Sequence, residues 1–362
     1  MKMRKGLPAL ALGLTLLATG CGGASTSGSG DSSAEAGKLT LENCGKKVEY
    51  TVPVTKLMAN DGNIISIALA AGAKDQLTAV TSLQRDEGVL KLKYGEDVIN
   101  GLNQVSPEYM NLENIVAADP QVVFAGYGYG FSDEKGTDPD SLAKRGYLTY
   151  TLSEACRTGE GSKRGTMSPW EALDADIRNI GAMTGNKAKA DKVADEITKR
   201  REEIEKLPQP DKKPTAFLFD SASDTVFSSG KFGAPQAMMD SAGIKNVLED
   251  VDDTWTKVSW ERLASADPDI IFFVDYPPQT IEEKIQALES NPASKNLKAV
   301  KEKRYVNLPY AMWCSGPLNV EGAEYIRMAM EHFGLAPKTD IKSDLDLTKL
   351  DSLAGNEWLK QK

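Results

Sequence analysis

Apolar positions along this chain follow two alternating periods, which together predict an α/β fold. Short runs rich in β-branched and aromatic residues predict strands at residues 56–59, 77–81, 122–125 and 148–151. Helical periodicity fills the intervals, most clearly at residues 64–71 and 112–117. Strands that alternate with helices predict a largely parallel sheet with helices on both faces.

The same alternation starts again after residue 214 and predicts a second lobe of the same kind. Strand-like runs lie at residues 216–219, 270–274 and 304–308. Helical patterns separate or follow them, at residues 235–242, 260–264, 281–288 and 320–332. We therefore expect two similar α/β lobes, spanning residues 38–168 and 213–337, with a C-terminal extension over residues 338–362.

Two helical segments with no strand between them connect the lobes over residues 169–207. The first begins at Ser168-Pro169-Trp170-Glu171, where a serine N-cap, an early proline and a glutamate at the third position form a capping box. It extends to about Met183, and a second helix with an apolar stripe follows from residue 187 to about 207. Prolines end that helix, so one long helix joins the lobes.

One pattern occurs twice. Residues 111–124 recur as residues 259–272 at a constant offset, and Glu, Ala, Asp, Pro and Phe coincide at matched places. Each copy predicts a short helix, an Asp-Pro turn and a buried strand. The period is too long for a solenoid, whose units have roughly 20–50 residues. The repeat therefore supports two related lobes, and a cleft between lobes is a favoured ligand site.

The N-terminus predicts export and a lipid anchor. Residues 1–5 are basic, residues 7–18 form an apolar run too short to span a bilayer, and small residues precede Cys21. This resembles a bacterial lipoprotein signal (residues 1–20) with Cys21 as the lipidated first residue, although Ala18 stands where Leu is more usual. An ordinary secretory signal with an incidental cysteine is the alternative. Residues 21–37, rich in Gly and Ser, predict a disordered tether.

Charge excludes one class of partner. Removing the signal takes away Lys2, Arg4 and Lys5 and lowers the formal net charge from −9 to −12. An acidic protein whose basic run at residues 199–201 is followed by two glutamates is a poor nucleic-acid ligand. We expect a monomer that binds no nucleic acid.

Three cysteines follow the predicted anchor, so at least one is unpaired. We favour a disulfide between Cys44 and Cys156, because both fall in the first lobe. A bridge between Cys156 and Cys314 would instead restrain lobe motion. Three free thiols are the third possibility.

Loops that follow the predicted strands carry the candidate ligand-binding residues. Open α/β sheets bind ligands beyond the carboxyl ends of their strands, and the loops at these ends are rich in aromatic residues. Such a mouth suits stacking on a flat or conjugated ligand, although each ring can equally pack on its own lobe. The aromatic candidates are Tyr127, Tyr129, Trp255, Tyr276 and Trp313, and the basic candidates, otherwise surface charges, are Arg85 and Lys231.

Metal sites and enzymes are disfavoured. His332 is the only histidine, and a zinc site needs three or four ligands. Haem ligation through histidine is disfavoured for the same reason, whereas tyrosine ligation stays open. The glycine-rich stretch at residues 126–131 has Phe131 where a dinucleotide loop needs its third glycine, and no Gly-x-Ser-x-Gly elbow is present. We expect no enzyme, with a carboxylate-dependent hydrolase as the least favoured alternative.

Taken together, these features resemble the substrate-binding lipoproteins of ABC importers, in the class that carries ferric siderophores, cobalamin or haem. The local matches are Met110-Asn111-Leu112-Glu113 before Asp119-Pro120, Val258-Ser259-Trp260-Glu261 before Asp267-Pro268, and Gly243-Ile244-Lys245-Asn246-Val247. Apart from the lipid site, the resemblance covers residues 39–335. It implies two lobes joined by one helix, with the ligand in the cleft.

The resemblance also implies partners. Glu113 and Glu261 would engage arginines of two permease subunits, driven by a cytoplasmic ATPase, although a glutamate near a helix N-terminus is favoured in any case. The protein would be lipid-anchored on the extracytoplasmic face of the cell membrane. It would need no cofactor, although its ligand can carry chelated iron or cobalt. A ferric siderophore leads, followed by cobalamin and a deazaflavin-type cofactor precursor. The alternative from another class is a sensor or adhesin lipoprotein.

Overall fold

A parallel sheet forms the centre of the N-terminal lobe in the computed structural model, which describes residues 37–159 and 163–360. Four strands lie in the order β5-β4-β3-β6, and both β7 and β8 pair with β6. Every described strand pair of this sheet is parallel. The bounds are β3 Leu57–Asn60, β4 Leu77–Thr81, β5 Gln104–Ser106, β6 Val122–Tyr127, β7 Gly130–Phe131 and β8 Leu148–Thr151. The predicted signal, the lipidation site Cys21 and nearly all of the tether lie outside the described residues.

Helices cover this sheet, and a hairpin that the sequence patterns did not predict precedes it. The helices are α1 Gly62–Ala70, α2 Glu87–Tyr94, α3 Glu96–Asn100, α4 Leu112–Ala118 and α5 Pro139–Ala143. Helix α1 is buried along its whole length, because it packs between the sheet and the linking helix α6 (Pro169–Met183). The antiparallel hairpin pairs β1 (Gly37–Asn43) with β2 (Lys46–Val52).

The C-terminal lobe has a second parallel sheet, in the order β12-β9-β14-β15. Its strands are β9 Thr215–Phe219, β12 Lys245–Asn246, β14 Ile270–Asp275 and β15 Tyr305–Pro309. A small antiparallel sheet, in the order β10-β11-β13, was not predicted; it consists of Ser221–Ala222, Val226–Ser229 and Trp255–Val258. The helices of this lobe are α8 Ala234–Ala242, α9 Trp260–Ala266, α10 Ile281–Ser290, α11 Lys298–Lys301, α12 Tyr310–Trp313 and α13 Asn319–His332.

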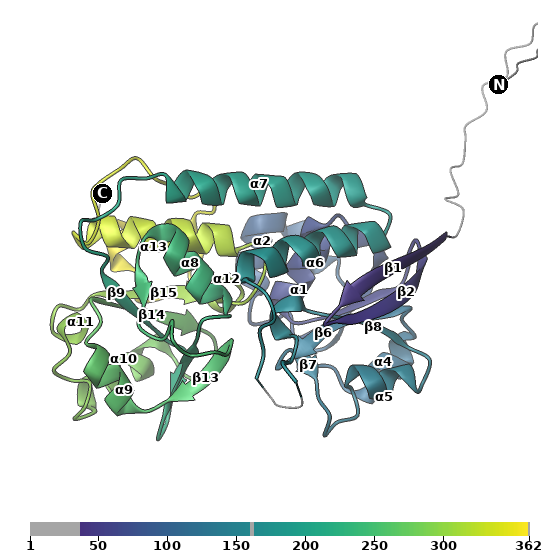
Figure 1. The fold of residues 1–362 in the computed structure, drawn as a ribbon, viewed down its shortest axis with the longest axis horizontal. Helices are drawn as coiled ribbons and strands as arrows, with labels where there is room; N and C mark the ends of the chain where they lie inside the picture. Colours follow the sequence, from purple (N-terminus) through teal and green to yellow (C-terminus); the bar gives the residue numbers. More distant parts are fainter. Residues whose placement is uncertain (1–36, 160–162, 361–362) are drawn as a thin grey trace, which may run out of the picture. The chain divides into compact units, whose positions relative to one another are not determined.

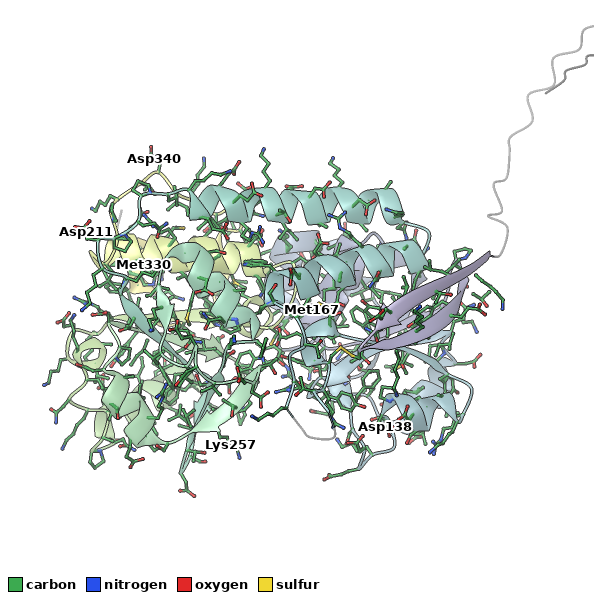
Figure 2. The ribbon with its side chains drawn as sticks, in the orientation of Figure 1. Asp138, Met167, Asp211, Lys257, Met330 and Asp340 are labelled. Atoms are coloured by element: carbon green, nitrogen blue, oxygen red, sulfur yellow. A yellow bond between two sulfur atoms is a disulfide. The ribbon has the colours of Figure 1, made fainter. Side chains whose placement is uncertain are left out.

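Helices α6 and α7 (Lys187–Glu205) connect the two sheets, which confirms the predicted architecture. The capping box at the start of α6 is present, and Glu171 Oε2 accepts from the Ser168 backbone N–H at 3.4 Å. Figure 1 shows α7 running along the top of the view above both lobes. Charged side chains project from its outer face (Figure 2), whereas Arg200 bonds inward to Glu321 and Glu324 of α13.

The sequence repeat corresponds to a structural repeat. Asn111 Oδ1 accepts from the backbone N–H three residues on at the start of α4, and Ser259 Oγ does the same for α9. Each helix ends at an aspartate with a positive φ, 43° at Asp119 and 39° at Asp267. A proline and a buried parallel strand follow in both copies. Matched caps, turns and strands at one spacing identify α4–β6 and α9–β14 as equivalent units.

The C-terminal extension packs on the folded body. The Asn307 backbone N–H donates to Asn356 Oδ1 at 3.1 Å, and Asn356 Nδ2 donates to the Asn307 carbonyl at 2.5 Å, which covers the edge strand β15. The Leu350 side chain reaches α2 of the other lobe, since a Cβ on Gly88 would lie 3.4 Å from it. Two 3₁₀ turns, η3 Leu347–Lys349 and η4 Glu357–Lys360, complete the extension. No helix among the described residues is long and apolar enough to cross a membrane.

Candidate functional site

A cavity of about 210 Å³ lies between the two lobes. Lining residues directly follow strands β6, β9, β14 and β15, and Arg85 lies in the loop after β4, at the carboxyl ends where open α/β sheets bind ligands. Its wall carries two arginines, six aromatic rings, an aspartate and a thiol. The lining residues are Arg85, Tyr109, Gly128, Tyr129 and Arg164 on one side, and Asp220, Phe227, Trp255, Tyr276, Tyr310 and Cys314 on the other.

Arg85 lies among three tyrosines that come from both lobes. Its guanidinium carbon is 4.8 Å from the ring centroid of Tyr310, 5.2 Å from that of Tyr109 and 5.9 Å from that of Tyr276. Its Nη2 donates to Ser82 Oγ at 2.9 Å. Stacked aromatic faces attract a cation and hold it in place. Arg85 therefore presents a positioned positive charge at the cavity wall.

Asp61 lies beneath this group and is fully buried. Its Oδ2 accepts from the Tyr109 hydroxyl at 2.9 Å and from the Tyr310 hydroxyl at 3.1 Å, and Arg85 Nε is 3.9 Å from its Oδ1. Burial raises the pKa of Asp61, while Arg85 and the two hydroxyls oppose that rise. These contacts fix both tyrosines and the arginine around one carboxylate.

Asp86 supplies a second contact between the lobes. Its Oδ1 accepts from the Ala311 backbone N–H at 2.8 Å, in the first turn of α12. Burial, followed by the nearby carboxylate of Asp61, raises the pKa of Asp86 to about 8. At neutral pH this side chain is therefore mainly protonated, so two adjacent buried carboxylates do not both carry charge.

Trp255 of β13 is the main contact on the opposite wall. Its indole Nε1 donates to Glu154 Oε1 at 3.2 Å, and its ring stacks on Phe227 with centroids 6.1 Å apart. Its carbonyl accepts from Arg164 Nη2 at 3.2 Å. Glu154 and Arg164 precede the linking helices, whereas Trp255 belongs to the C-terminal lobe. Trp255 therefore makes hydrogen bonds to the segment across the cavity through both its backbone carbonyl and its indole.

Four of the predicted ligand-binding residues meet in this cavity: Arg85, Tyr129, Trp255 and Tyr276. Sequence reasoning did not select its other side chains, which are Tyr109, Arg164, Asp220, Phe227, Tyr310 and Cys314. Tyr310 and Asp220 directly follow predicted strands, so their position in the sequence was an available signal. Tyr109 lies in the loop before α4, and Phe227 lies in a strand that the patterns did not reveal.

Tyr127 does not line the cavity. The chain reverses at Gly128, with backbone bonds in both directions between Gly126 and Tyr129. Gly128 has φ 84°, a conformation that favours glycine. The reversal sends Tyr129 to the cavity, while Tyr127 faces a separate surface depression, where Arg157 lies 3.5 Å from its ring centroid.

Lys231 is also outside the cavity, contrary to the prediction. Its backbone N–H donates to the Val251 carbonyl, and its side chain is 54% exposed. The ammonium lies 3.7 Å from Asp252 and over the ring of Phe232, beside an open surface depression. Lys231 is therefore the solvated surface charge that the sequence allowed as the alternative.

Trp313 is a core residue rather than a ligand-binding one. Its side chain is fully buried, Nε1 donates to the Phe273 carbonyl at 2.9 Å, and the ring packs on Phe272. The chain turns into the short helix α12 directly after β15. That turn places Tyr310 at the cavity and Trp313 against the sheet.

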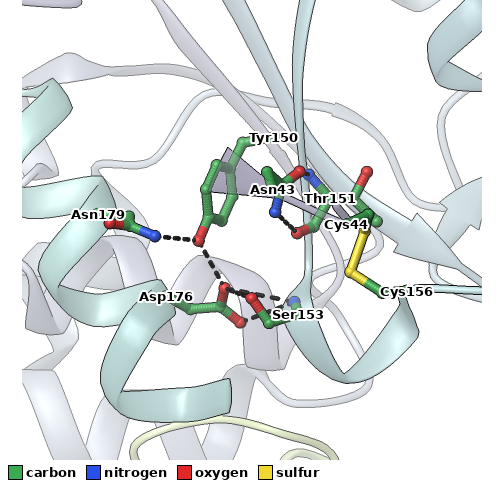
Figure 3. Close-up of a disulfide and its surroundings, with 8 residues drawn as sticks. All are labelled: Asn43, Cys44, Tyr150, Thr151, Ser153, Cys156, Asp176 and Asn179. Carbon is green, nitrogen blue, oxygen red and sulfur yellow. Dashed lines mark hydrogen bonds between the residues drawn. A yellow bond between two sulfur atoms is a disulfide. The ribbon is translucent and has the colours of Figure 1, made fainter. Parts of the chain in front are cut away.

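The structure joins Cys44 and Cys156 in a disulfide and leaves Cys314 as a buried free thiol. Figure 3 shows the disulfide beside a buried network in which the Tyr150 hydroxyl donates to Asp176 Oδ1 at 2.8 Å. Asp176 also accepts from the Ser153 hydroxyl and backbone N–H. The disulfide and this network fix the segment after β8 to the hairpin and to α6.

Glu113 and Glu261 occupy the second position of the equivalent helices α4 and α9, and both are exposed. The two helices belong to different lobes. Figure 1 shows both along the lower edge of the view, on the side of the sheets away from α7. Two carboxylates on separate lobes of one face can contact a single large partner.

The described residues hold no group of three or more His, Cys, Asp or Glu side chains that could bind a metal ion. His332 lies at the end of α13, where its ring contacts Phe333 and Trp358. It is not among the residues that line the cavity. The single histidine therefore has a packing role.

Sequence comparison assigns a family. The family model described as periplasmic binding protein matches residues 59–311, which is most of the chain and includes elements of both lobes. Among curated proteins, none matches this chain in sequence.

Solved structures with the same fold include transport proteins. A protein of an ABC-type Fe³⁺-hydroxamate transport system from Saccharomonospora viridis has a TM-score of 0.68 and 19% identity, covering 81% of this chain and 98% of its own. A periplasmic haem-binding protein from Pseudomonas aeruginosa has a TM-score of 0.59 and 17% identity, covering 80% and 95%. The vitamin B12-binding protein BtuF of Vibrio cholerae has a TM-score of 0.56 and 16% identity, covering 78% and 98%. At these identities the likeness establishes the fold.

Proposed function

Because this chain belongs to the periplasmic binding protein family, we propose that it captures a large organic or metal-chelate ligand between its lobes and delivers it to an ABC importer. Members of this family are extracytoplasmic binding proteins of transport systems and not enzymes. The observation that carries the proposal is the inter-lobe cavity, where Arg85 is held among tyrosines of both lobes.

The cavity wall favours a ligand that carries oxygen acceptors and offers flat or apolar faces. Aromatic rings offer faces for stacking, and a guanidinium held by three of them meets carboxylate or hydroxamate oxygens. The names of the solved neighbours give an Fe³⁺-hydroxamate transport system, a haem-binding protein and a vitamin B12-binding protein. A ferric hydroxamate is our leading ligand for this chain, since the Arg85 guanidinium suits a chelate rimmed by oxygen atoms and the tyrosine rings suit its apolar faces. Cobalamin and a deazaflavin-type cofactor precursor are the alternatives.

The size of the cavity limits how a ligand can enter. Its volume of about 210 Å³ is below the roughly 300–1,000 Å³ typical of ligand pockets. A chelate of the proposed class therefore enters only when the lobes move apart. We accordingly expect ligand binding to change the separation of the lobes.

The remaining parts of the proposal concern anchoring and delivery. Cys21 would carry the lipid that holds the protein at the extracytoplasmic face of the membrane. Glu113 and Glu261 would dock on two permease subunits, because each is exposed at the same place on an equivalent helix of its own lobe. The ATPase of the importer would supply the energy, and this protein would supply affinity and specificity.

A titration of tryptophan fluorescence tests the ligand class. Trp255 lies in the cavity wall, so a ligand there changes its emission. The probes are ferric desferrioxamine, cyanocobalamin, haemin and a deazaflavin. We expect saturable quenching by ferric desferrioxamine, weakened in the Arg85→Gln variant. The Lys231→Gln variant is the matched control, because Lys231 lies outside the cavity. Saturation by none of the probes would contradict the proposal.

A further inference from the structure

The second arginine of the cavity, Arg164, differs from Arg85 in what its guanidinium contacts. Arg164 Nη1 donates to the Tyr127 carbonyl at 2.9 Å, and Nη2 donates to the Trp255 carbonyl at 3.2 Å. One carbonyl belongs to β6 of the N-terminal lobe and the other to β13 of the C-terminal lobe. A single guanidinium therefore ties the main chains of the two lobes together beside the cavity.

The backbone around Arg164 is fixed to the N-terminal lobe. Arg157 and Arg164 form an isolated β-bridge, and the Gly165 N–H donates to the Cys156 carbonyl at 2.9 Å. Cys156 is in turn bonded to Cys44 in the hairpin before the sheet. The backbone at Arg164 is therefore held to the N-terminal lobe, next to the disulfide, while its side chain bonds to the C-terminal lobe.

Two glycines let this segment approach both lobes closely. A Cβ on Gly128 would lie 2.6 Å from Arg164 Nη1, and a Cβ on Gly165 would lie 2.3 Å from Phe232 of the C-terminal lobe. The Arg164 backbone N–H also donates to Asp253 Oδ1 at 3.2 Å, two residues before Trp255. The close approach therefore depends on the absence of side chains at Gly128 and Gly165.

Glu154 holds the other end of the same tryptophan. Its Oε1 accepts from Trp255 Nε1 at 3.2 Å and from the Tyr129 hydroxyl at 3.4 Å. Glu154 is 2% exposed and Trp255 is 7% exposed, so both contacts are shielded from water. A hydrogen bond in such a low-dielectric interior is stronger than the same bond in water.

We propose that Arg164 and Glu154 form a latch that closes the cavity by binding the backbone and the indole of Trp255, and that this leaves Arg85 as the arginine that meets the ligand. The guanidinium of Arg164 already donates to two carbonyls, whereas that of Arg85 rests on ring faces and one hydroxyl. The latch must open before a ligand larger than the cavity can enter. The inference rests on the proposed function only in taking this cavity as the binding site.

Distance measurement between the lobes, with no ligand added, tests the latch. Spin labels at Val116→Cys on α4 and Ser265→Cys on α9 report the separation, because both positions are exposed and the native free thiol is buried. We expect Arg164→Gln to lengthen or broaden the distance distribution. Arg164→Lys, which can reach one carbonyl, should fall between that variant and the wild type. Combining Arg164→Gln with Glu154→Leu should give the largest change.

The matched control is Arg157→Gln. Arg157 lies on the same segment, but the contacts of its side chain with described residues are to Tyr127 and Asp133 of the N-terminal lobe, so its loss should leave the distances unchanged. Circular dichroism and the melting temperature establish that each variant is folded. A wild-type distribution in the folded double variant would overturn the latch.

Ligand kinetics separate this inference from the proposed function. If the latch must open first, ferric desferrioxamine should associate faster with Arg164→Gln than with the wild type, because more of the protein is competent to bind. Arg85→Gln should weaken that binding without the faster association expected of Arg164→Gln. Failure of this probe to bind would count against the proposed function, while the distances would still decide on the latch.

Discussion

Tyr310 of the C-terminal lobe donates its hydroxyl to the fully buried carboxylate of Asp61 in the N-terminal lobe, at 3.1 Å. The same oxygen accepts from Tyr109, so two tyrosines from different lobes meet at one atom. Both rings also hold Arg85. The Asp61 side chain thus positions the two tyrosines and the arginine that form this wall of the cavity.

The first prediction concerns this bond. Tyr310→Phe removes one of the two hydroxyls that donate to the buried Asp61 side chain, so we expect the free energy of unfolding to fall by about 1–3 kcal/mol. Urea denaturation measures it. Tyr305→Phe is the control, because the Tyr305 hydroxyl makes only long contacts, 3.4 Å to Glu289 and 3.5 Å to the Val300 carbonyl. An equal fall in the free energy of unfolding of both variants would contradict a stabilising role for the hydrogen bond from Tyr310 to Asp61.

The second prediction concerns pH and Glu154. Burial raises the pKa of Glu154 from 4.5 to about 7, opposed by Arg164, the backbone at Ala234 and two side-chain donors. Below pH 4.5 both the folded and the unfolded protein hold this proton. Between pH 4.5 and about 7 the unfolded chain releases it while the folded protein keeps it, so the free energy of unfolding falls as pH rises. Above that window the contribution is constant.

Glu154→Gln should remove this part of the pH dependence. Glutamine keeps an oxygen that can accept from the Trp255 indole but has no proton to release. Denaturation from pH 4.5 to 7 should therefore show a less steep decline for the variant than for the wild type. Asp176 and Asp86 also titrate with raised pKa values, of about 7 and about 8, so the difference between the two proteins is the informative quantity. Parallel curves would contradict the assignment.

The third prediction concerns the disulfide. Cys44 and Cys156 are 112 residues apart, and a bridge over such a loop restricts the unfolded chain. Replacing both with serine should lower the free energy of unfolding by about 2–4 kcal/mol. A reducing agent should weaken the wild type by a similar amount and leave the double variant unaffected. Cys314→Ala, which removes only the free thiol, should respond to the reducing agent as the wild type does.

Most strands of the central sheets were predictable from sequence because nearly all of their residues are buried. Strands β4 and β8 have the predicted bounds, and β14 extends its prediction by one residue. Such strands are continuous apolar runs, which can be identified in the sequence without knowledge of the neighbouring strands. The β1–β2 hairpin was missed because most of its side chains are exposed or half-buried, so it lacks an apolar run.

Cavity residues that lie just after a strand were predictable from the sequence. Residues whose position is set by the path of a loop were not. Arg85, Tyr129 and Tyr276 follow strands closely, and they line the cavity. Tyr127 ends β6 and Trp313 closely follows β15, but neither lines the cavity, because a glycine reversal follows Tyr127 and a four-residue helix contains Trp313. Arg164 follows no strand of the sheets, and its place at the cavity depends on the disulfide and on contacts distant in sequence.

The fourth prediction concerns docking on the permease. Replacing both Glu113 and Glu261 with alanine should abolish uptake of the transported ligand, because each exposed carboxylate would contact one of two permease subunits. Binding of that ligand to the purified variant should be unchanged, since neither residue lines the cavity. Uptake by cells and fluorescence titration of the purified protein measure the two effects separately.

A helix-capping role for these glutamates has to be separated from docking. Glu282 provides the control, because it is exposed at the second position of α10, as Glu113 is in α4 and Glu261 is in α9. Replacing any one of the three with alanine should lower the free energy of unfolding by about 0.3–1 kcal/mol, because an acidic side chain near a helix N-terminus stabilises the helix by that amount. Uptake should then fail for the Glu113 and Glu261 variants and persist for Glu282→Ala. Loss of uptake in all three, in proportion to stability, would assign the glutamates to the helices alone.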